Sequence, residues 1–255
     1  MNKTKKFLSF FLSILVTFIL FGTTFSKNVK ADTLPVQLYY GKYIQTAILD
    51  GSCYEYSATG YIAVQKSSYS KNISIHYSTD NGTNWQDTNA NYVKDNSTDG
   101  YEIWSFNLAL NDNSSLQFAI KYESNGETYW DNNYGKNYYL SSGNTSTFGK
   151  SQLYTTVYND GNVPTGSNII GSITLNNIGN PKVVKIRYSY DNWATYLETN
   201  ANYNSTSNNN SLDYWDFTIP SNPSSKQVKF AISYEVNGIE YWDNNFGNNY
   251  TVNYV

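Results

Sequence analysis

The string FAIKYESNGETYWDNNYGKNY at residues 118–138 returns as FAISYEVNGIEYWDNNFGNNY at residues 230–250, an offset of 112 residues. A second string, TNANY at 88–92, returns at 199–203 with an offset of 111. A repeat of this length has the size of a whole domain and is too long for a solenoid unit. The sequence therefore predicts two similar domains, residues 32–141 and 151–255, joined by a short linker at 142–150 that is rich in small residues.

Apolar and polar side chains alternate within both copies, which is the period of a half-buried strand. The alternating apolar positions are Ile73, Ile75, Tyr77, Trp104, Phe106, Leu108, Phe118, Ile120 and Tyr122, with Val184, Ile186, Tyr188, Trp215, Phe217, Ile219, Phe230, Ile232 and Tyr234 in the second copy. Turns rich in Asn, Gly and Ser separate these segments. The pattern predicts an all-β chain with an antiparallel β-sandwich in each domain.

Residues 1–31 have the features of a signal peptide. Lys3, Lys5 and Lys6 precede an apolar run at 7–21, and small residues around Ala31 suit a signal peptidase. The apolar run is short for a bilayer core, which needs about 20 residues. We expect export of Gram-positive type with cleavage after Ala31, and the alternative is an uncleaved anchor.

Composition and charge narrow the function classes. Of the 255 residues 17% are aromatic and 15% are charged. Cleavage removes five of the 17 basic residues and none of the 20 acidic ones, so the mature charge of −8 disfavours nucleic acid. Cys53 is the only cysteine, which excludes an intramolecular disulfide and indicates a half-buried structural thiol.

The hairpins at Asn125-Gly126 and Asn237-Gly238 decide which aromatic side chains lie outside. A two-residue Asn-Gly turn sets the register, so that Tyr122 faces Tyr129 and Lys121 faces Trp130. Because Tyr122 is a core position, Tyr129 is predicted to be core and Trp130 to face solvent. The same register places Trp242 opposite Ser233, also facing solvent.

Each outward Trp is followed by Asp-Asn-Asn and then by Gly, Asn and Tyr. An exposed indole can stack on the apolar C–H face of a pyranose, while neighbouring amides and a carboxylate bind its hydroxyls. This pattern favours a sugar-binding surface. The alternative is that both Trp side chains cover a sheet end and that the Asn run is only a turn.

At these residues the chain resembles the family-21 carbohydrate-binding modules, the starch- and glycogen-binding domains of fungal glucoamylase and of glycogen-targeting subunits of protein phosphatase 1. The matching strings are FAIKY with YWDNNYGKNY, FAISY with YWDNNFGNNY, and RYSYDNWATY at 187–196. The resemblance covers residues 60–140 and 171–252. It implies immunoglobulin-like sandwiches with two α-glucan sites in each domain.

One implied site joins the Trp of the DNW triplet to the Trp before DNN, here Trp193 and Trp242. In the first domain Gly82 replaces the first of these, and Trp85 lies three residues further on to cooperate with Trp130. Together with the amides and carboxylates that follow each outward Trp, the candidate residues of this site are Trp193, Trp242, Asp243, Asn244, Asn245 and Asn249, with Trp85, Trp130, Asp131, Asn132, Asn133 and Asn137 in the first domain.

The other implied site uses tyrosines, a lysine and an acid. The first domain supplies Tyr69, Lys71, Tyr92, Tyr101 and Glu102, and the second keeps Lys182 and Tyr203. Asn180, Leu212 and Asp213 stand in place of the other three. We therefore expect the first domain to rely on the tyrosine-rich site and the second on its two tryptophans.

Catalytic chemistry is poorly supported by the residues. His76 is the only histidine and matches Arg187 of the other copy, so it is expected to be a solvated strand residue. Two compact domains offer no cleft for a glycosidase carboxylate pair. We expect no enzymatic activity, no cofactor and no metal, with a structural Ca²⁺ at Asp131 or Asp243 as an alternative.

The segment Lys226–Phe230 has the pattern of a phosphatase-docking motif, but Val228 and Phe230 alternate into the expected core. The sequence predicts a secreted or cell-surface monomer that binds α-1,4-glucans and has no membrane contact after cleavage. A separate secreted amylase is a further candidate partner. The rival hypothesis is an adhesin or scaffold that binds proteins through the same exposed rings.

Overall fold

The computed structural model describes residues 34–48, 53–66, 70–96 and 99–255. Residues 34–255 form one compact unit. The described backbone consists of strands and turns, with no helix in these ranges. The predicted signal peptide at 1–31 lies outside the described residues.

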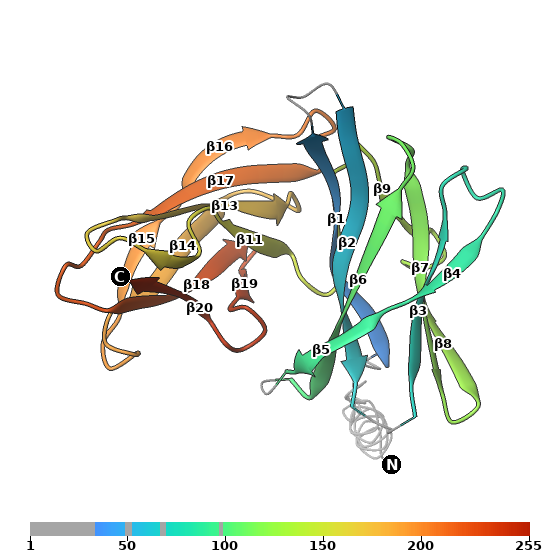
Figure 1. Ribbon diagram of the computed structural model, residues 1–255, viewed down its shortest axis with the longest axis horizontal. Helices are drawn as coiled ribbons and strands as arrows, with labels where there is room; N and C mark the ends of the chain where they lie inside the picture. The colour runs from blue at the N-terminus through green and yellow to red at the C-terminus, as the bar shows by residue number, and fades with distance from the viewer. Residues whose placement is uncertain (1–33, 49–52, 67–69, 97–98) are drawn as a thin grey trace, which may run out of the picture. The chain divides into compact units, whose positions relative to one another are not determined.

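The first ten strands form two sheets that face each other, and we call them the first module (Figure 1). One sheet has the order β10 (Ser146–Phe148), β1 (Val36–Ile48), β2 (Cys53–Gln65), β6 (Tyr101–Leu110) and β5 (Asn91–Asp95). The other has the order β4 (Gln86–Asn89), β3 (Asn72–Ser78), β7 (Leu116–Ser124) and β8 (Glu127–Asp131), with β9 (Tyr138–Leu140) also paired to β7. The predicted antiparallel sandwich is confirmed.

The last ten strands form the second module in the same way. One sheet has the order β11 (Leu153–Val157), β13 (Ile169–Asn176), β17 (Leu212–Ile219) and β16 (Asn202–Thr206). The other has the order β12 (Gly161–Val163), β20 (Tyr250–Tyr254), β18 (Gln227–Val236), β14 (Lys182–Ser189) and β15 (Leu197–Asn200), with β19 (Ile239–Asp243) also paired to β18. The short β12 runs parallel to β20 and extends the sheet.

The alternating apolar side chains meet between the two sheets of each module. Phe106, Phe118 and Tyr122 are among the largest fully buried side chains of the first module, and Phe230 and Tyr234 fill the same places in the second. Burying such rings contributes about 1.5–3 kcal/mol each relative to exposure. The cores follow directly from the period-two pattern of the sequence.

The predicted hairpin register is confirmed. Lys121 pairs with Trp130 across β7 and β8, and Ser233 pairs with Trp242 across β18 and β19. Asn125 and Gly126 both have positive φ, 53° and 82°, as a type I′ turn requires. Tyr129 was expected in the core and this is wrong: its ring stacks on Tyr122 at 5.7 Å but stays exposed, because it lies on the edge strand.

The segment expected as a linker is part of the first module. Within residues 142–150, β10 pairs with β1, and the backbone N–H of Lys150 donates to the carbonyl of Leu38 at 2.6 Å. A Cβ atom on Gly149 would lie 2.2 Å from the Leu38 carbonyl oxygen, so only glycine fits there. This segment therefore adds a strand to the sheet and does not act as a loose tether.

The two modules pack against each other through aromatic side chains. Phe246 of the second module lies edge-on to Tyr39 at 5.1 Å and close to Tyr61 at 5.0 Å, over the outer face of the first module's sheet. Tyr40 stacks on Tyr154 at 4.9 Å. The Lys94 ammonium adds a hydrogen bond of 2.9 Å to the Asn245 carbonyl.

Candidate carbohydrate-binding surfaces

Two exposed indoles lie on corresponding strands of the two modules. Trp130 on β8 is 43% exposed and Trp242 on β19 is 38% exposed. Trp130 pairs with Lys121 and Trp242 pairs with Ser233, so both indoles lie on the face of the sheet that points away from the core. The sequence-based placement of both rings is confirmed.

In the first module Trp130 belongs to a group of three rings, which we call the first platform. The imidazole of His76 on β3 stacks flat on Trp85, with centroids 4.8 Å apart and planes 9° apart. Trp130 meets the same imidazole edge-on at 5.4 Å. Asp87 on β4 lies opposite His76 and contacts its Nδ1 at 2.5 Å, which fixes the ring between its neighbours.

In the second module a guanidinium takes the place of the imidazole, and we call this group the second platform. The Arg187 guanidinium lies 4.7 Å from the Tyr196 ring centroid and 4.9 Å from that of Trp242. Glu198, opposite Arg187 across β14 and β15, accepts a hydrogen bond of 2.8 Å from its Nε. The carboxylate therefore holds the guanidinium between the two rings.

Sequence reasoning missed His76, Arg187 and Tyr196 as site residues. His76 was interpreted as a solvated strand residue, whereas the structure places its ring within the platform. The usable signal was positional: His76 and Arg187 align between the copies, each with an acid facing it on the next strand. Both residues can pack against an aromatic ring, and they lie at the same position of the two copies. This indicates that they have the same role beside the exposed tryptophan.

Trp193 lies on the loop that carries Tyr196, but within the described residues its ring does not pair with that of Trp242. Its backbone has a positive φ of 71°, and its N–H donates to Ser189 at 2.8 Å. Gly82 has the matching conformation and donates to Ser78 at 2.9 Å. The buried Nε1 of Trp193 has no hydrogen-bond partner in the described part of the chain.

An aspartate shapes this loop in each module. Hydrogen bonds from the backbone N–H of Asn84 and from Ser78 lower the pKa of Asp80 to about 2. Hydrogen bonds from the backbone and side chain of Thr195 lower the pKa of Asp191 in the same way. Both carboxylates are therefore ionised and occupied by the loop's own donors.

The Asp-Asn-Asn run forms a turn whose polar groups mostly bond to the turn itself. Asp131 is buried and accepts the backbone N–H of Leu38 at 2.7 Å and the hydroxyl of Tyr138 at 2.9 Å. Asn132 accepts the N–H of Gly135, and Asn133 donates to the carbonyl of Asn137. The structure thus agrees with the turn alternative for these side chains, because alternation along β8 sends Asp131 to the face opposite Trp130.

The turn of the second copy contains corresponding hydrogen bonds. Asp243 accepts the Tyr250 hydroxyl at 2.8 Å, and loss of surrounding water raises the pKa of this carboxyl group. Asn244 accepts the N–H of Gly247, and Asn245 donates to the carbonyl of Asn249. Asn137 and Asn249 serve the turn through their positive φ, 58° and 59°. The asparagines therefore stabilise the turn that follows the tryptophan strand.

The other predicted site of the first module is built on a buried ion pair. The Lys71 ammonium contacts Glu102, which also accepts a hydrogen bond of 3.1 Å from the Trp104 indole. The exposed Tyr92 meets Trp104 edge-on at 5.8 Å. Tyr69 lies outside the described residues.

Tyr101 does not join this group. It is only 6% exposed and packs on the opposite face of the sheet with Tyr39 and Ile103. The reason is the period of the strand, which directs Glu102 and Trp104 to one face and Tyr101 and Ile103 to the other. The expectation that Tyr101 and Glu102 act together is therefore not met.

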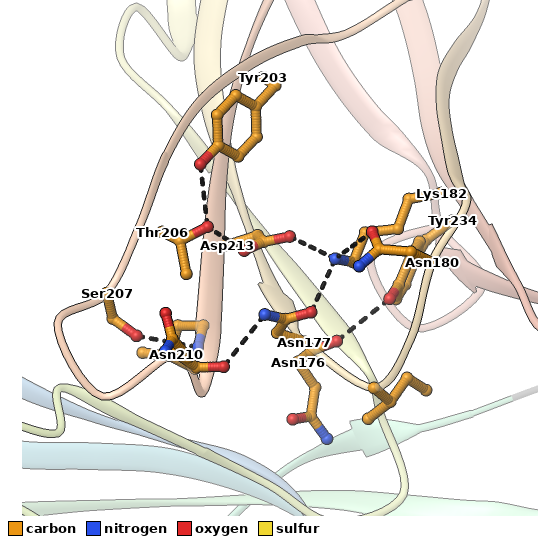
Figure 2. A network of polar contacts seen from close by, with 12 residues as sticks. Asn176, Asn177, Asn180, Lys182, Tyr203, Thr206, Ser207, Asn210, Asp213 and Tyr234 are labelled. Carbon is orange, nitrogen blue, oxygen red and sulfur yellow. Dashed lines mark hydrogen bonds and ion pairs between the residues drawn. The ribbon is translucent and has the colours of Figure 1, made fainter.

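The second module contains the corresponding arrangement, drawn in Figure 2. Lys182 and Asp213 form a buried ion pair at 2.6 Å, and Lys182 also donates to Asn177 at 2.7 Å. Tyr203 meets Trp215 edge-on at 5.7 Å, and Tyr203, Lys182 and Trp215 line one shallow groove. Asp213 is one methylene shorter than Glu102, and the buried Nε1 of Trp215 has no partner among the described residues.

Both modules thus carry a platform and a lysine–carboxylate site. Lys182 and Tyr203 are placed like Lys71 and Tyr92. The expectation that the first module relies on its tyrosine-rich site and the second on its tryptophans stays a prediction.

Three other sequence predictions concern chemistry away from these sites. Val228 and Phe230 are fully buried, which confirms that the docking-like pattern at 226–230 belongs to the core. Cys53 is exposed at the start of β2, so its interpretation as a half-buried thiol is wrong. Among the described residues no three His, Cys, Asp or Glu side chains gather as metal ligands do.

No described helix has the length and apolar character needed to cross a membrane.

Comparison with known proteins identifies one family in both modules. The sequence model described as "Carbohydrate/starch-binding module (family 21)" matches residues 43–141 and again 154–253. Glucoamylase 1 of Rhizopus oryzae is 34% identical over 146 residues, covering 54% of this chain and 22% of that protein. The glycogen-binding subunit 76A of Drosophila melanogaster is 38% identical over 84 residues, covering 31% of this chain and 12% of that protein.

Protein phosphatase 1 regulatory subunit 3C of Xenopus tropicalis is 33% identical over 88 residues, covering 34% of this chain and 40% of that protein. The chain therefore spans less than half the length of each of these relatives. Among solved structures, the starch-binding domain of Rhizopus oryzae glucoamylase in complex with β-cyclodextrin and maltoheptaose is 31% identical. The match covers 44% of this chain and 96% of that domain, with a TM-score of 0.33.

Proposed function

The chain belongs to the family-21 carbohydrate/starch-binding modules, and from this premise we propose that it is a non-catalytic binding protein for α-1,4-glucans. The observation that carries the proposal is the pair of platforms. Each presents an exposed indole braced by a flat polar group, His76 or Arg187. A glucose ring can lay its apolar C–H face on such an indole, while Asp87 or Glu198 beside it accepts hydrogen bonds from hydroxyls.

The expected affinity of one platform is modest. A partly buried aromatic ring contributes about 1–3 kcal/mol, so a site of two rings and a few polar groups reaches about millimolar to tens of micromolar. Several sites on one chain compensate for this weakness. A polymer bound at more than one site gains about 10² to 10⁴ in avidity when the geometry permits.

Retention on raw starch tests the proposal. We expect the protein to be pulled down by starch and released by maltoheptaose, with no retention on cellulose. Trp130→Ala combined with Trp242→Ala should abolish most of the retention, because both stacking surfaces are removed. Trp193→Ala, added to Trp242→Ala, measures whether the loop tryptophan contributes.

The matched control is Tyr158→Ala, which removes an exposed ring outside both platforms and both lysine–carboxylate sites. Starch retention that survives the Trp130/Trp242 double substitution would refute the platform assignment. Retention on protein ligands with no retention on any glucan would instead favour the adhesin hypothesis.

We also propose that the protein acts outside the cell, after cleavage of residues 1–31, beside a secreted glucan-degrading enzyme. The relatives named as glucoamylase and as glycogen-binding subunits support an α-glucan as the shared ligand class. The burial of Val228 and Phe230 argues against docking to a phosphatase through the 226–230 pattern.

A further inference from the structure

Two clefts flank the segment that connects the modules. One, of about 280 Å³, opens beside Trp130 and is also lined by Phe148, Gly149 and Lys150. The other, of about 330 Å³, opens beside Trp242 and is lined by Lys150 and the residues that follow it, up to Leu153. Lys150 lines both clefts, so the two clefts adjoin at this residue, and we refer to the pair as one groove. Each volume is near the lower limit of about 300 Å³ for ligand sites.

The floor of this groove is formed by the backbone around Gly149, which is hydrogen-bonded to β1. Gly149 has no side chain and lies directly against β1, where its N–H donates to the Tyr39 carbonyl at 3.1 Å. Ser151 donates its N–H to the same carbonyl at 3.2 Å. Phe148 stacks on Tyr154 at 5.9 Å, which holds the segment against the second module. The backbone is therefore preorganised, and a ligand that lies over it need not order it.

The middle of the groove is polar and held in place. The Lys150 ammonium lies 3.6 Å from the Asp99 carboxylate and 4.5 Å from the Tyr101 ring centroid. Asp99 also accepts the Tyr39 hydroxyl at 3.0 Å. Lys150 and Asp99 are both partly exposed, so the ammonium and carboxylate can donate to and accept from sugar hydroxyls.

From these observations, and resting on the function proposed above, we propose that a single linear α-glucan chain binds along this groove. It contacts Trp130 at one end and Trp242 at the other, and passes over Gly149 with its hydroxyls bonded to Lys150 and Asp99. The two platforms then act as the ends of one binding site formed by both modules, and the junction selects long chains over short ones.

Calorimetric titration of the full chain with maltotriose, maltoheptaose and a longer linear amylose tests this proposal. If one chain spans both ends, Trp130→Ala should weaken the binding of long amylose at the remaining Trp242 end by about tenfold or more, because the shared contact is lost. The same substitution should leave the maltotriose dissociation constant at Trp242 unchanged. Trp242→Ala should act in the same way on the Trp130 end.

Lys150→Ala should lower the affinity for long amylose and leave maltotriose binding unchanged. The matched control is Lys136→Ala, an exposed lysine in the Asp-Asn-Asn turn that lines neither cleft. Lys150 also contacts Asp99 and Tyr101, so Lys150→Ala can change the stability of the protein. If Lys150→Ala changes the unfolding temperature, the proposal is judged on the Trp130→Ala result.

A Trp130→Ala variant that loses only binding stoichiometry, with the same dissociation constant for long amylose at the other end, would overturn the shared site and leave the proposed function intact. Absence of binding to every chain length by the unsubstituted protein would overturn the proposed function itself.

Discussion

At the scale of single residues, Arg187 and His76 occupy the same position in their modules and have the same kind of neighbours. Each has an aromatic side chain from the following loop on one side, the strand tryptophan on the other, and an acid on the adjacent strand. The acid fixes the flat group, and the flat group fixes the indole. The orientation of the exposed ring therefore depends on a residue that need not touch the ligand.

This arrangement predicts the effect of Arg187→Ala. Removing the guanidinium takes away a cation–π contact worth about 0.5–1 kcal/mol and leaves Trp242 without its support. We expect malto-oligosaccharide affinity at the second platform to fall by about three- to fivefold, with little change in the unfolding temperature. Titration followed by tryptophan fluorescence measures this effect.

Lys185→Ala is the matched control, since Lys185 lies on the same strand 3.6 Å from the same Glu198 but contacts neither ring. Equal losses of affinity in the two variants would show that charge near Glu198 matters, and that support of the ring does not.

The sequence predicted single residues well where strand register decides, and poorly where a side chain has a choice of partners. Trp130 and Trp242 were placed correctly because an Asn-Gly turn leaves one register. The asparagines after them were expected to contact sugar, but a turn with several positive φ angles needs its own hydrogen bonds, and these amides supply them. Tyr101 followed a family motif that the alternation of its strand overrides.

At the scale of elements, β10 and the residues after it show how a short segment can become structural. Residues 142–150 have the small, polar composition of a flexible connection, yet β10 completes a sheet and Gly149 fits tightly against Leu38. Composition indicates only the average conformational preference of a segment. A single close backbone contact, such as that of Gly149, also depends on the partner strand, so composition does not predict it. Long alternating strands such as β7 and β18 were predictable, and a three-residue edge strand was not.

Gly149→Ala tests whether residues 142–150 contribute to the stability of the fold. The added Cβ would lie 2.2 Å from the Leu38 carbonyl oxygen, which is backbone and cannot move aside without displacing β1. Overpacking of this kind costs about 1–3 kcal/mol or more. We expect a lower free energy of unfolding, measured by urea denaturation.

Gly143→Ala is the control within the same segment, because its Cβ would come no closer than 3.9 Å to the Ser141 hydroxyl. If both substitutions leave the free energy of unfolding unchanged, the segment is looser than its hydrogen bonds indicate.

At the scale of the whole molecule, Lys42 lies where the two modules pack against each other, and its ammonium is largely removed from water. The Lys42 ammonium lies 3.8 Å from the Tyr154 ring centroid, and burial lowers its pKa to about 8 from the ordinary 10.5, although the Asp243 carboxylate acts in the opposite direction. At pH values below 8 the folded state must carry this buried charge. The resulting cost is therefore full near neutral pH and shrinks as the pH rises from 8 towards 10.5.

Comparison with Lys42→Met reveals this cost. Each pKa unit corresponds to about 1.4 kcal/mol, so the free energy of unfolding of the unsubstituted protein should rise relative to Lys42→Met by about 1 kcal/mol between pH 7 and pH 9. Urea denaturation of both proteins at the two pH values measures the difference. Lys136→Met, at an exposed position, controls for the loss of a positive charge.

A difference between Lys42→Met and the unsubstituted protein that stays constant from pH 7 to pH 9 would contradict the lowered pKa of Lys42.

Phe246 and the rings beneath it have a consequence for how the molecule can be divided. The outer face of the first module's sheet carries Tyr39, Tyr61 and Ile103, and the second module shields it. If the first module were produced by itself, these hydrophobic side chains would meet solvent. We expect such a truncated protein to self-associate in solution, which light scattering would detect. A first module that stays monomeric by itself would contradict this prediction.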